Sequence, residues 1–258
     1  MIRKALLIFM LLIMLGSICG CSKPQVQQQV TLRLAAAASL EKIMTQKLIP
    51  MYRKDNPGVK LEGTYASSGK LQIQLEQGMG ADVFISAANK QMQALSNKGF
   101  IAESKPLLKN ELVLIVPKEN SNANIKSFAD FPKAKQPAIG DPRSVPAGHY
   151  AKEALMSLKL WNSVEKRASL GVNVVEVLNW VAEGSADAGL VYATDAASND
   201  KVKVVAAAPA GAIKNPIIYP IGILKKSEKA KEAKKFAAFL SSEQAQNVFR
   251  EYGCQKAE

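Results

Sequence analysis

The chain contains very little cysteine and almost no histidine. Of its 258 residues, three are cysteines (Cys19, Cys21 and Cys254) and one is histidine (His149). Two of the cysteines lie at the end of an N-terminal targeting segment described below. Cys254 therefore has no obvious intramolecular disulfide partner, and the hydrophobic core must supply the stability of the mature chain. A single histidine also gives little basis for a histidine-based metal site or a Ser-His-Asp triad.

Aromatic residues are also few, at 6% of the chain, although the formal net charge is +12. The lysines are distributed along the sequence, and the densest run, Lys225–Lys235, is interrupted by glutamates as on a solvated helix face. No stripe of alternating basic and aromatic residues is present. The composition therefore argues against nucleic-acid binding.

A long hydrophobic run is missing as well. The apolar stretch Ala5–Leu15 follows Arg3 and Lys4 and is too short for a transmembrane helix, which needs roughly 20 residues. We interpret residues 1–20 as a secretory signal peptide. Its end, Ile18-Cys19-Gly20-Cys21, resembles a bacterial lipobox, so we expect an exported protein with a lipid attached to Cys21. Residues 21–29 are polar and would form a tether. Ordinary signal cleavage beside incidental cysteines is the alternative.

The rest of the chain alternates between strand and helix patterns, which favours an α/β fold with mostly parallel sheets flanked by helices. The apolar segments 112–117 and 217–224 are candidate crossings between two lobes. The expected strands are 30–36, 59–65, 82–86, 112–117, 138–140, 189–193, 203–207 and 217–224, and the expected helices include 39–52, 68–77, 89–97 and 173–183, followed by two at the C-terminus.

Four loops rich in small and hydroxyl residues precede helices. They are Ala35–Leu40, Tyr65–Leu71, Pro146–Gly148 and Gly171–Val174. In open α/β sheets, ligands bind at the carboxyl ends of the strands, where such loops converge. The N–H groups of a helix's first turn have no intrahelical partner and favour anions.

These loops offer hydroxyls and backbone N–H groups without paired carboxylates, a histidine cluster or a phosphate-binding Gly-Lys-Ser loop. Such donors can surround an ionised anion but are poorly suited to hydrolysis or group transfer. The pattern therefore favours a receptor over an enzyme. Ser39 and Ser68 could instead act only as helix N-caps, and a cap stabilises a helix by about 1 kcal/mol.

The chain resembles the molybdate-binding proteins (ModA) of bacterial ABC importers from about Val30 to Gly253. The segments that carry the resemblance are Ala36-Ala37-Ala38-Ser39-Leu40, Ala66-Ser67-Ser68, Gly80-Ala81-Asp82-Val83-Phe84-Ile85-Ser86-Ala87, Gly140-Asp141-Pro142, Val145-Pro146-Ala147-Gly148, Tyr150-Ala151-Lys152-Glu153-Ala154-Leu155, Gly189-Leu190-Val191-Tyr192 and Thr194-Asp195-Ala196. Each segment alone is weak evidence, whereas the presence of all of them in this order along the chain is specific for the family. Two positions depart from the family pattern: Gly69 stands where many relatives carry a third hydroxyl residue, and Val175 where a basic residue is common.

The resemblance implies a two-lobed periplasmic-binding-protein type II fold with an oxyanion in the cleft between lobes. Lobe 1 would comprise residues 30–113 plus 221–258, and lobe 2 residues 114–220. The resemblance places the oxyanion-binding residues at Ser39, Ser68, Ala147, Val174 and Tyr192. They would bind the metal in the form of its oxyanion, molybdate. The ligand would be molybdate or tungstate, with no cofactor. The partner would be an ABC permease of the membrane that the lipid anchor holds nearby, and the protein would act as a monomer.

Three alternatives remain open at this point. A receptor for another tetrahedral oxyanion, such as sulfate, would use the same donors. An exported enzyme acting on an anionic substrate would need a nucleophile-base pair or a metal site, which His149 and Cys254 do not supply. A structural or adhesion domain would not need the four loops. Because hydroxyls and amides do not titrate near neutrality, we expect binding to be nearly independent of pH between about 6 and 8, with His149 turned away from the anion.

Overall fold

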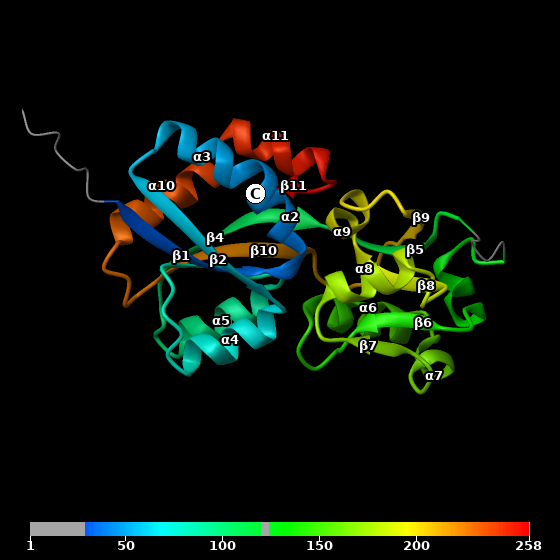
Figure 1. The fold of residues 1–258 in the computed structure, drawn as a ribbon. Helices are drawn as coiled ribbons and strands as arrows, with labels where there is room; N and C mark the ends of the chain where they lie inside the picture. Colours follow the sequence, from blue (N-terminus) through cyan, green and yellow to red (C-terminus); the bar gives the residue numbers. More distant parts are fainter. Residues whose placement is uncertain (1–28, 120–123, 258) are drawn as a thin grey trace, which may run out of the picture.

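The computed structural model describes residues 29–119 and 124–257. The expected signal peptide, tether and Cys21 therefore lie outside the described residues, apart from Gln29. Two sheets form two lobes that lie side by side (Figure 1). The two-lobed α/β architecture expected from the sequence is confirmed.

The first sheet has six strands in the order β11-β4-β10-β3-β1-β2. β1 runs parallel to β2 and β3, whereas β10 runs antiparallel to β3 and β4. This sheet is therefore mixed, which corrects the expectation of mostly parallel strands. Its strands are β1 (Val30–Ala37), β2 (Val59–Ala66), β3 (Val83–Ile85), β4 (Ile101–Asn110), β10 (Ile217–Leu224) and β11 (Gln255–Lys256).

The second sheet has five strands in the order β7-β6-β8-β5-β9. β6 runs parallel to β7 and β8, and β5 runs antiparallel to β8 and β9. The antiparallel pairs arise where the chain enters or returns to a sheet without a crossover helix. The strands are β5 (Leu112–Pro117), β6 (Pro137–Gly140), β7 (Ser169–Gly171), β8 (Ala188–Tyr192) and β9 (Val202–Ala207).

The chain passes between the sheets twice. It leaves the first sheet after Asn110, enters the second at Leu112, leaves it after Ala207 and returns at Ile217. Leu112 and Val113, expected in lobe 1, therefore pair in the second sheet. Residues 217–220, expected in lobe 2, pair in the first.

Helices cover both faces of the first sheet, with α3, α10 and α11 on one face and α4 and α5 on the other (Figure 1). β3 shows the consequence for packing. Val83 and Ile85 belong to the main core, whereas Phe84 packs with Leu71 and Leu95 in a separate apolar cluster. The helices of this lobe are η1 (Ala38–Leu40), α2 (Glu41–Ile43), η2 (Met44–Leu48), α3 (Ile49–Asp55), α4 (Ser68–Glu76), α5 (Asn89–Asn97), α10 (Ala230–Leu240) and α11 (Glu243–Glu251).

The expected helix 39–52 is divided into four segments. η1 is a 3₁₀ turn and η2 a π-helical turn, in which the Ile49 N–H bonds to the Met44 carbonyl. Pro50 follows in the first turn of α3 and has no N–H to donate, so a regular α-helical bond is lost there.

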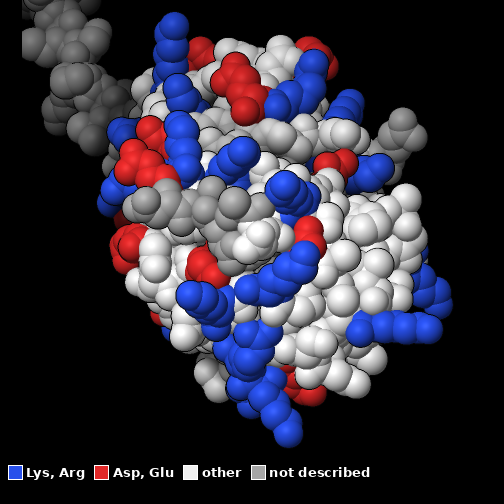
Figure 2. Space-filling view, turned by 90° about the vertical axis from the view of Figure 1, so that its right-hand side faces the viewer, with Lys and Arg blue, Asp and Glu red and all other residues white. Residues whose placement is uncertain are grey.

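In the second lobe, helix starts and stops follow the sequence signals. The Asn173 side chain accepts a hydrogen bond from the Glu176 N–H, and α8 ends before Gly184, whose φ of +76° favours glycine. The helices of this lobe are η3 (Phe128–Lys133), α6 (Pro146–Ser157), α7 (Trp161–Val164), α8 (Val174–Ala182) and α9 (Ala193–Ala197). On the face shown in Figure 2, acidic side chains are scattered among more numerous basic ones.

Candidate oxyanion-binding site

The five residues expected at the site line one small cavity between the lobes. It is formed by the ends of β1 and β2, the loop after β3, the starts of α6 and α8, and the end of β8. The lining residues are Ala37, Ala38, Ser39, Ala66, Ser67, Ser68, Ala87, Val145, Pro146, Ala147, Val174 and Tyr192. None of them is charged.

The cavity is compact. The space open to the centre of a water molecule is about 10 Å³, close to the minimum for one bound water. Its lining is deeply buried: Ser68 and Ala147 are 0% exposed, and Ser39 is 6% exposed. As it stands in this structure the cavity therefore holds little more than one water molecule, and a larger ligand requires the residues that line it to move apart.

Neither serine acts as a helix cap. Ser39 lies inside η1, and its Oγ is 3.0 Å from the Tyr219 hydroxyl. Ser67, not Ser68, caps α4 by accepting from the Lys70 N–H. The Ser68 Oγ instead accepts a hydrogen bond from the Ala87 N–H at 2.9 Å. The capping explanation that the sequence left open is therefore wrong for both serines.

The starts of α6 and α8 bring backbone donors to the same cavity. No side chain caps α6, and helix geometry leaves the N–H groups of its first turn, including that of Ala147, without intrahelical partners. The Asn173 side chain, which caps α8, accepts a hydrogen bond from the Glu176 N–H. The Val174 N–H is therefore left without a side-chain acceptor. Both helices also direct the positive ends of their dipoles here.

α6 can reach this position because of a close backbone contact. A Cβ atom on Gly148 would lie 1.9 Å from the Gly140 carbonyl oxygen, so only glycine allows α6 to pack this closely on β6. The sequence motif Pro146-Ala147-Gly148 thus has a packing role in addition to placing the Ala147 amide.

Tyr192 closes the cavity from the second lobe. Its Oη lies 3.4 Å from the Ala87 carbonyl of the first lobe, and its ring packs edge-on against Tyr219 with centroids 5.5 Å apart. Burial raises the pKa of both tyrosines well above the usual value, so both hydroxyls keep their protons.

A second contact joins the lobes beside the cavity. The Gly69 N–H donates to the Ser144 carbonyl at 3.2 Å. A Cβ atom on Gly69 would lie 2.4 Å from that oxygen. The glycine that departs from the family pattern therefore allows close approach of the lobes in this structure.

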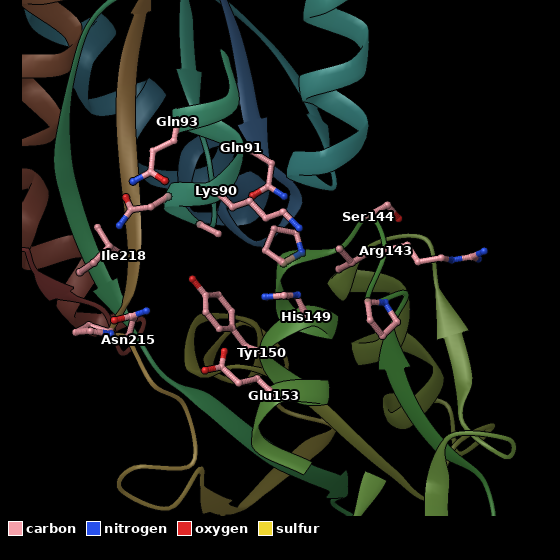
Figure 3. A pocket seen from close by; sticks show the side chains of 16 residues that line it. Lys90, Gln91, Gln93, Arg143, Ser144, His149, Tyr150, Glu153, Asn215 and Ile218 are labelled. Atoms are coloured by element: carbon pink, nitrogen blue, oxygen red, sulfur yellow. The ribbon is translucent and has the colours of Figure 1, made fainter. Parts of the chain in front are cut away.

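An outer pocket of about 530 Å³ lies beside the cavity and shares Val145 and Pro146 with it (Figure 3). Lys90 and Gln91 from α5 face His149 across this pocket. His149 is exposed and does not line the inner cavity. The structure thus places His149 away from the residues expected to hold the anion.

Sequence reasoning gave no role to three residues near the cavity. Tyr219 and Asn110 are buried and hydrogen-bonded behind Ser39, and no motif marks either of them. Asp195 is 1% exposed and accepts from the Tyr192 N–H at 3.0 Å; burial raises its pKa to about 7. Asp195 belongs to the segment Thr194-Asp195-Ala196 that carries part of the family resemblance, but nothing in the sequence indicated its contact with Tyr192.

Residues 32–255 match the family of bacterial extracellular solute-binding proteins. The chain belongs to this family. It is 41% identical to the Bacillus subtilis protein named "Putative ABC transporter substrate-binding lipoprotein YvgL", with 92% of each chain covered. It is 38% identical to the molybdate-binding protein ModA of Haemophilus influenzae, over 84% of this chain and 87% of that protein.

A solved structure supports the same assignment for this solute-binding protein. The "substrate binding domain of putative molybdenum ABC transporter from Clostridium difficile" is 41% identical, with a TM-score of 0.67, and the match covers 89% of this chain and all of that one. The Bacillus subtilis and Clostridium difficile relatives are named as substrate-binding parts of putative ABC transporters. Among residues 29–119 and 124–257, no group of three or more His, Cys, Asp or Glu side chains could hold a metal ion, and no helix is long and apolar enough to cross a membrane.

Proposed function

We propose that this solute-binding protein captures molybdate, and also tungstate, in the cavity between its lobes and delivers it to an ABC permease. The observation that carries the proposal is the lining of the cavity, which offers hydroxyls and helix-start amides from both lobes and no charged side chain. Such a lining stabilises a fully ionised oxyanion through hydrogen bonds and helix dipoles. The relatives from Haemophilus influenzae and Clostridium difficile support molybdenum as the cargo.

Ser39, Ser68 and Tyr192 would donate from hydroxyls, and Ala147 and Val174 from backbone N–H groups. Tungstate would bind in the same way because it has the same charge and nearly the same size. Sulfate is the second candidate ligand, since the same donors would recognise the charge and the tetrahedral shape that sulfate shares with molybdate. An enzymatic role has less support, because the cavity lining has no nucleophile-base pair.

Calorimetric titration with molybdate, tungstate, sulfate and phosphate tests the proposal. A hydrogen bond to a charged group contributes roughly 1.5–3 kcal/mol, so Ser39→Ala and Ser68→Ala should each weaken molybdate binding about 10- to 150-fold. Binding of sulfate but of neither molybdate nor tungstate would reject the ligand assignment. Unchanged affinity in both variants would reject the residue assignment.

We further propose that the protein is exported, cleaved before Cys21 and anchored to the membrane by lipid on that cysteine, and that it acts as a monomer. The lipoprotein name of the Bacillus subtilis relative supports the anchor. Two acyl chains give stable attachment, whereas one chain is marginal. The Cys21→Ala variant should be soluble outside the cytoplasm or remain unprocessed. If the mature Cys21→Ala protein still fractionates with membranes, the proposed lipid anchor is wrong. Light scattering of the purified protein measures its molar mass in solution and so tests whether it is a monomer.

A further inference from the structure

Two pockets adjoin the small cavity on different sides. The outer pocket, of about 530 Å³, shares Val145 and Pro146 with the cavity. A second pocket, of about 310 Å³, shares Ala38 and Ser39 with it, and we call this one the Lys42 pocket after a residue that lines it. Because the cavity itself has room for little more than one water molecule, an anion has to reach it through one of the openings around it.

Hydrogen bonds between the lobes hold two sides of the cavity together. The Lys42 Nζ donates to the Ser198 carbonyl oxygen and so joins α2 to the end of α9 across the Lys42 pocket. The Gly69 N–H donates to the Ser144 carbonyl at 3.2 Å and joins the start of α4 to the second lobe. In the part of the chain that the structure describes, no hydrogen bond or ion pair connects α5 to α6, which face each other across the outer pocket. The lobes are therefore least tied together at the outer pocket.

The Lys42 pocket is also a poor entrance for an anion because of its charges. Glu41 and Asp195 line it, and Lys42 is the one cation among its lining residues. The ammonium group of Lys42 is already bonded to the Ser198 carbonyl. A dianion that approached from this side would meet the Glu41 carboxylate and an ammonium group that has a partner.

The outer pocket offers a cation without such a partner, Lys90. This residue lies in the first turn of α5, lines the pocket and is exposed, and in Figure 3 it points toward His149 near the start of α6. Within the described residues Lys90 forms no ion pair. Arg143 also lines this pocket, but its guanidinium lies 2.7 Å from the Asp141 carboxylate, so these two charges largely offset each other.

The carboxylate of the outer pocket, Glu153, lies farther from the cavity. It is six residues beyond Ala147 on α6, which corresponds to about 9 Å along the helix axis. Its Oε1 accepts from the Lys214 N–H at 2.8 Å in the crossing between the lobes. Lys90, in contrast, is three residues from the cavity-lining Ala87, and α5 begins there without a side-chain cap, so its dipole adds to the positive potential. The potential in the outer pocket thus becomes more positive toward the cavity.

We propose that the oxyanion enters and leaves the cavity through the outer pocket and that Lys90 attracts it to this entrance. This inference rests on the proposed function. Lys90 does not line the cavity and so is not one of the groups that would hold the anion. Its attraction acts over a distance, at the entrance as well as in the cavity, and therefore speeds association and changes dissociation little.

Stopped-flow mixing with molybdate measures both rates in the wild type, Lys90→Gln and Lys90→Glu. A unit charge and a dianion about 10 Å apart in water attract each other enough to change a rate about fourfold. At low ionic strength we expect association to be about fourfold slower in Lys90→Gln and roughly 15-fold slower in Lys90→Glu, with dissociation changed less than about twofold. In about 0.5 M salt the difference between Lys90→Gln and the wild type should fall below about 1.5-fold.

Two variants serve as controls for net charge and for the side of approach. Lys54→Gln removes an exposed lysine at the end of α3, just before the start of β2, whereas the cavity lies at the end of β2. This variant should keep the wild-type rates. Gln46→Glu places a carboxylate in the Lys42 pocket and should slow association less than Lys90→Glu does.

Equal slowing by Lys90→Glu and Gln46→Glu would overturn the proposed route, and wild-type rates in both Lys90 variants would overturn the role of Lys90. A defect of Lys90→Gln that persists in high salt and appears in dissociation would make Lys90 a ligand-holding residue, which also contradicts the inference. If the wild type binds sulfate in place of molybdate and the Lys90 effect remains, the inference stands and the proposed cargo is rejected. A wild type that binds none of these oxyanions would reject both.

Discussion

Replacing Asp195 with asparagine should make the stability of the protein less dependent on pH. Asp195 is 1% exposed, and its Oδ2 accepts a hydrogen bond from the Tyr192 N–H. No ion pair to Asp195 is found within residues 29–119 and 124–257. Burial therefore dominates and raises the pKa of the carboxyl from 3.8 to about 7.

The sign of the effect follows from this shift. A carboxyl whose pKa is higher in the folded than in the unfolded state binds protons more tightly when folded. The stability from this group is fully present below pH 3.8 and is lost as the pH rises through 7. The loss reaches about 4 kcal/mol at pH 8, and roughly half of it has already occurred by pH 5.5.

Urea unfolding at several pH values between 5.5 and 8 measures this loss. The wild type should lose about 2 kcal/mol more than Asp195→Asn over that interval. Asparagine retains an oxygen that can accept from the Tyr192 N–H. Asp130→Asn is the control, because Lys133 and Ser127 hold the pKa of Asp130 far below this interval. Equal pH dependence in the wild type and Asp195→Asn would refute the reasoning.

Three further predictions concern the lobe contact, a helix cap and the outer pocket. Gly69→Ala should weaken anion binding at least tenfold while the protein still folds. The new Cβ atom would lie 2.4 Å from the Ser144 carbonyl oxygen and would hold the lobes apart. An affinity equal to that of the wild type in calorimetry would contradict this. Ser242→Ala, which removes the cap of α11, should lower stability by about 1 kcal/mol in urea unfolding and leave affinity intact; a loss of affinity would show that the two are coupled. His149→Gln should not change affinity between pH 6 and 8, since His149 lies in the outer pocket; tighter binding at pH 6 that disappears in the variant would place His149 at the anion.

The sequence indicated which residues would lie together, because these residues occupy strand ends and helix starts; that they bind an oxyanion stays a prediction. Ser39 follows the largely buried strand β1, Ser68 follows β2, in which apolar and polar residues alternate at first, and Ala147 and Val174 lie at the starts of helices. These local patterns and the family resemblance together predicted that the five residues would lie close to one another. In the structure all five line one cavity. The roles of the serines could not be predicted from the sequence. Ser67 and Ser68 are adjacent, and a shift of the start of α4 by one residue decides which of them is the helix cap.

Other features depend on tertiary contacts that leave no local pattern. Strand β4 was not expected, because Ile101–Asn110 is largely charged or polar and contains Pro106. It is tolerated near the sheet edge, where β11 pairs with only its last residues and a register irregularity in β10 falls opposite Pro106. Asn110 and Tyr219 meet 109 residues apart in sequence, and neither has a neighbour that marks it.

The strand order also constrains how the chain folds. The second sheet is built from one continuous segment, residues 112–207, so all its strands are present once that segment is synthesised. The first sheet is different, because β10 lies between β4 and β3 and comes from the far end of the chain. Until residues 217–224 are available, β4 cannot join the strands that precede it. The first lobe must therefore be completed last, although its sequence begins first, and the Ser39–Tyr219 contact forms only at that final step.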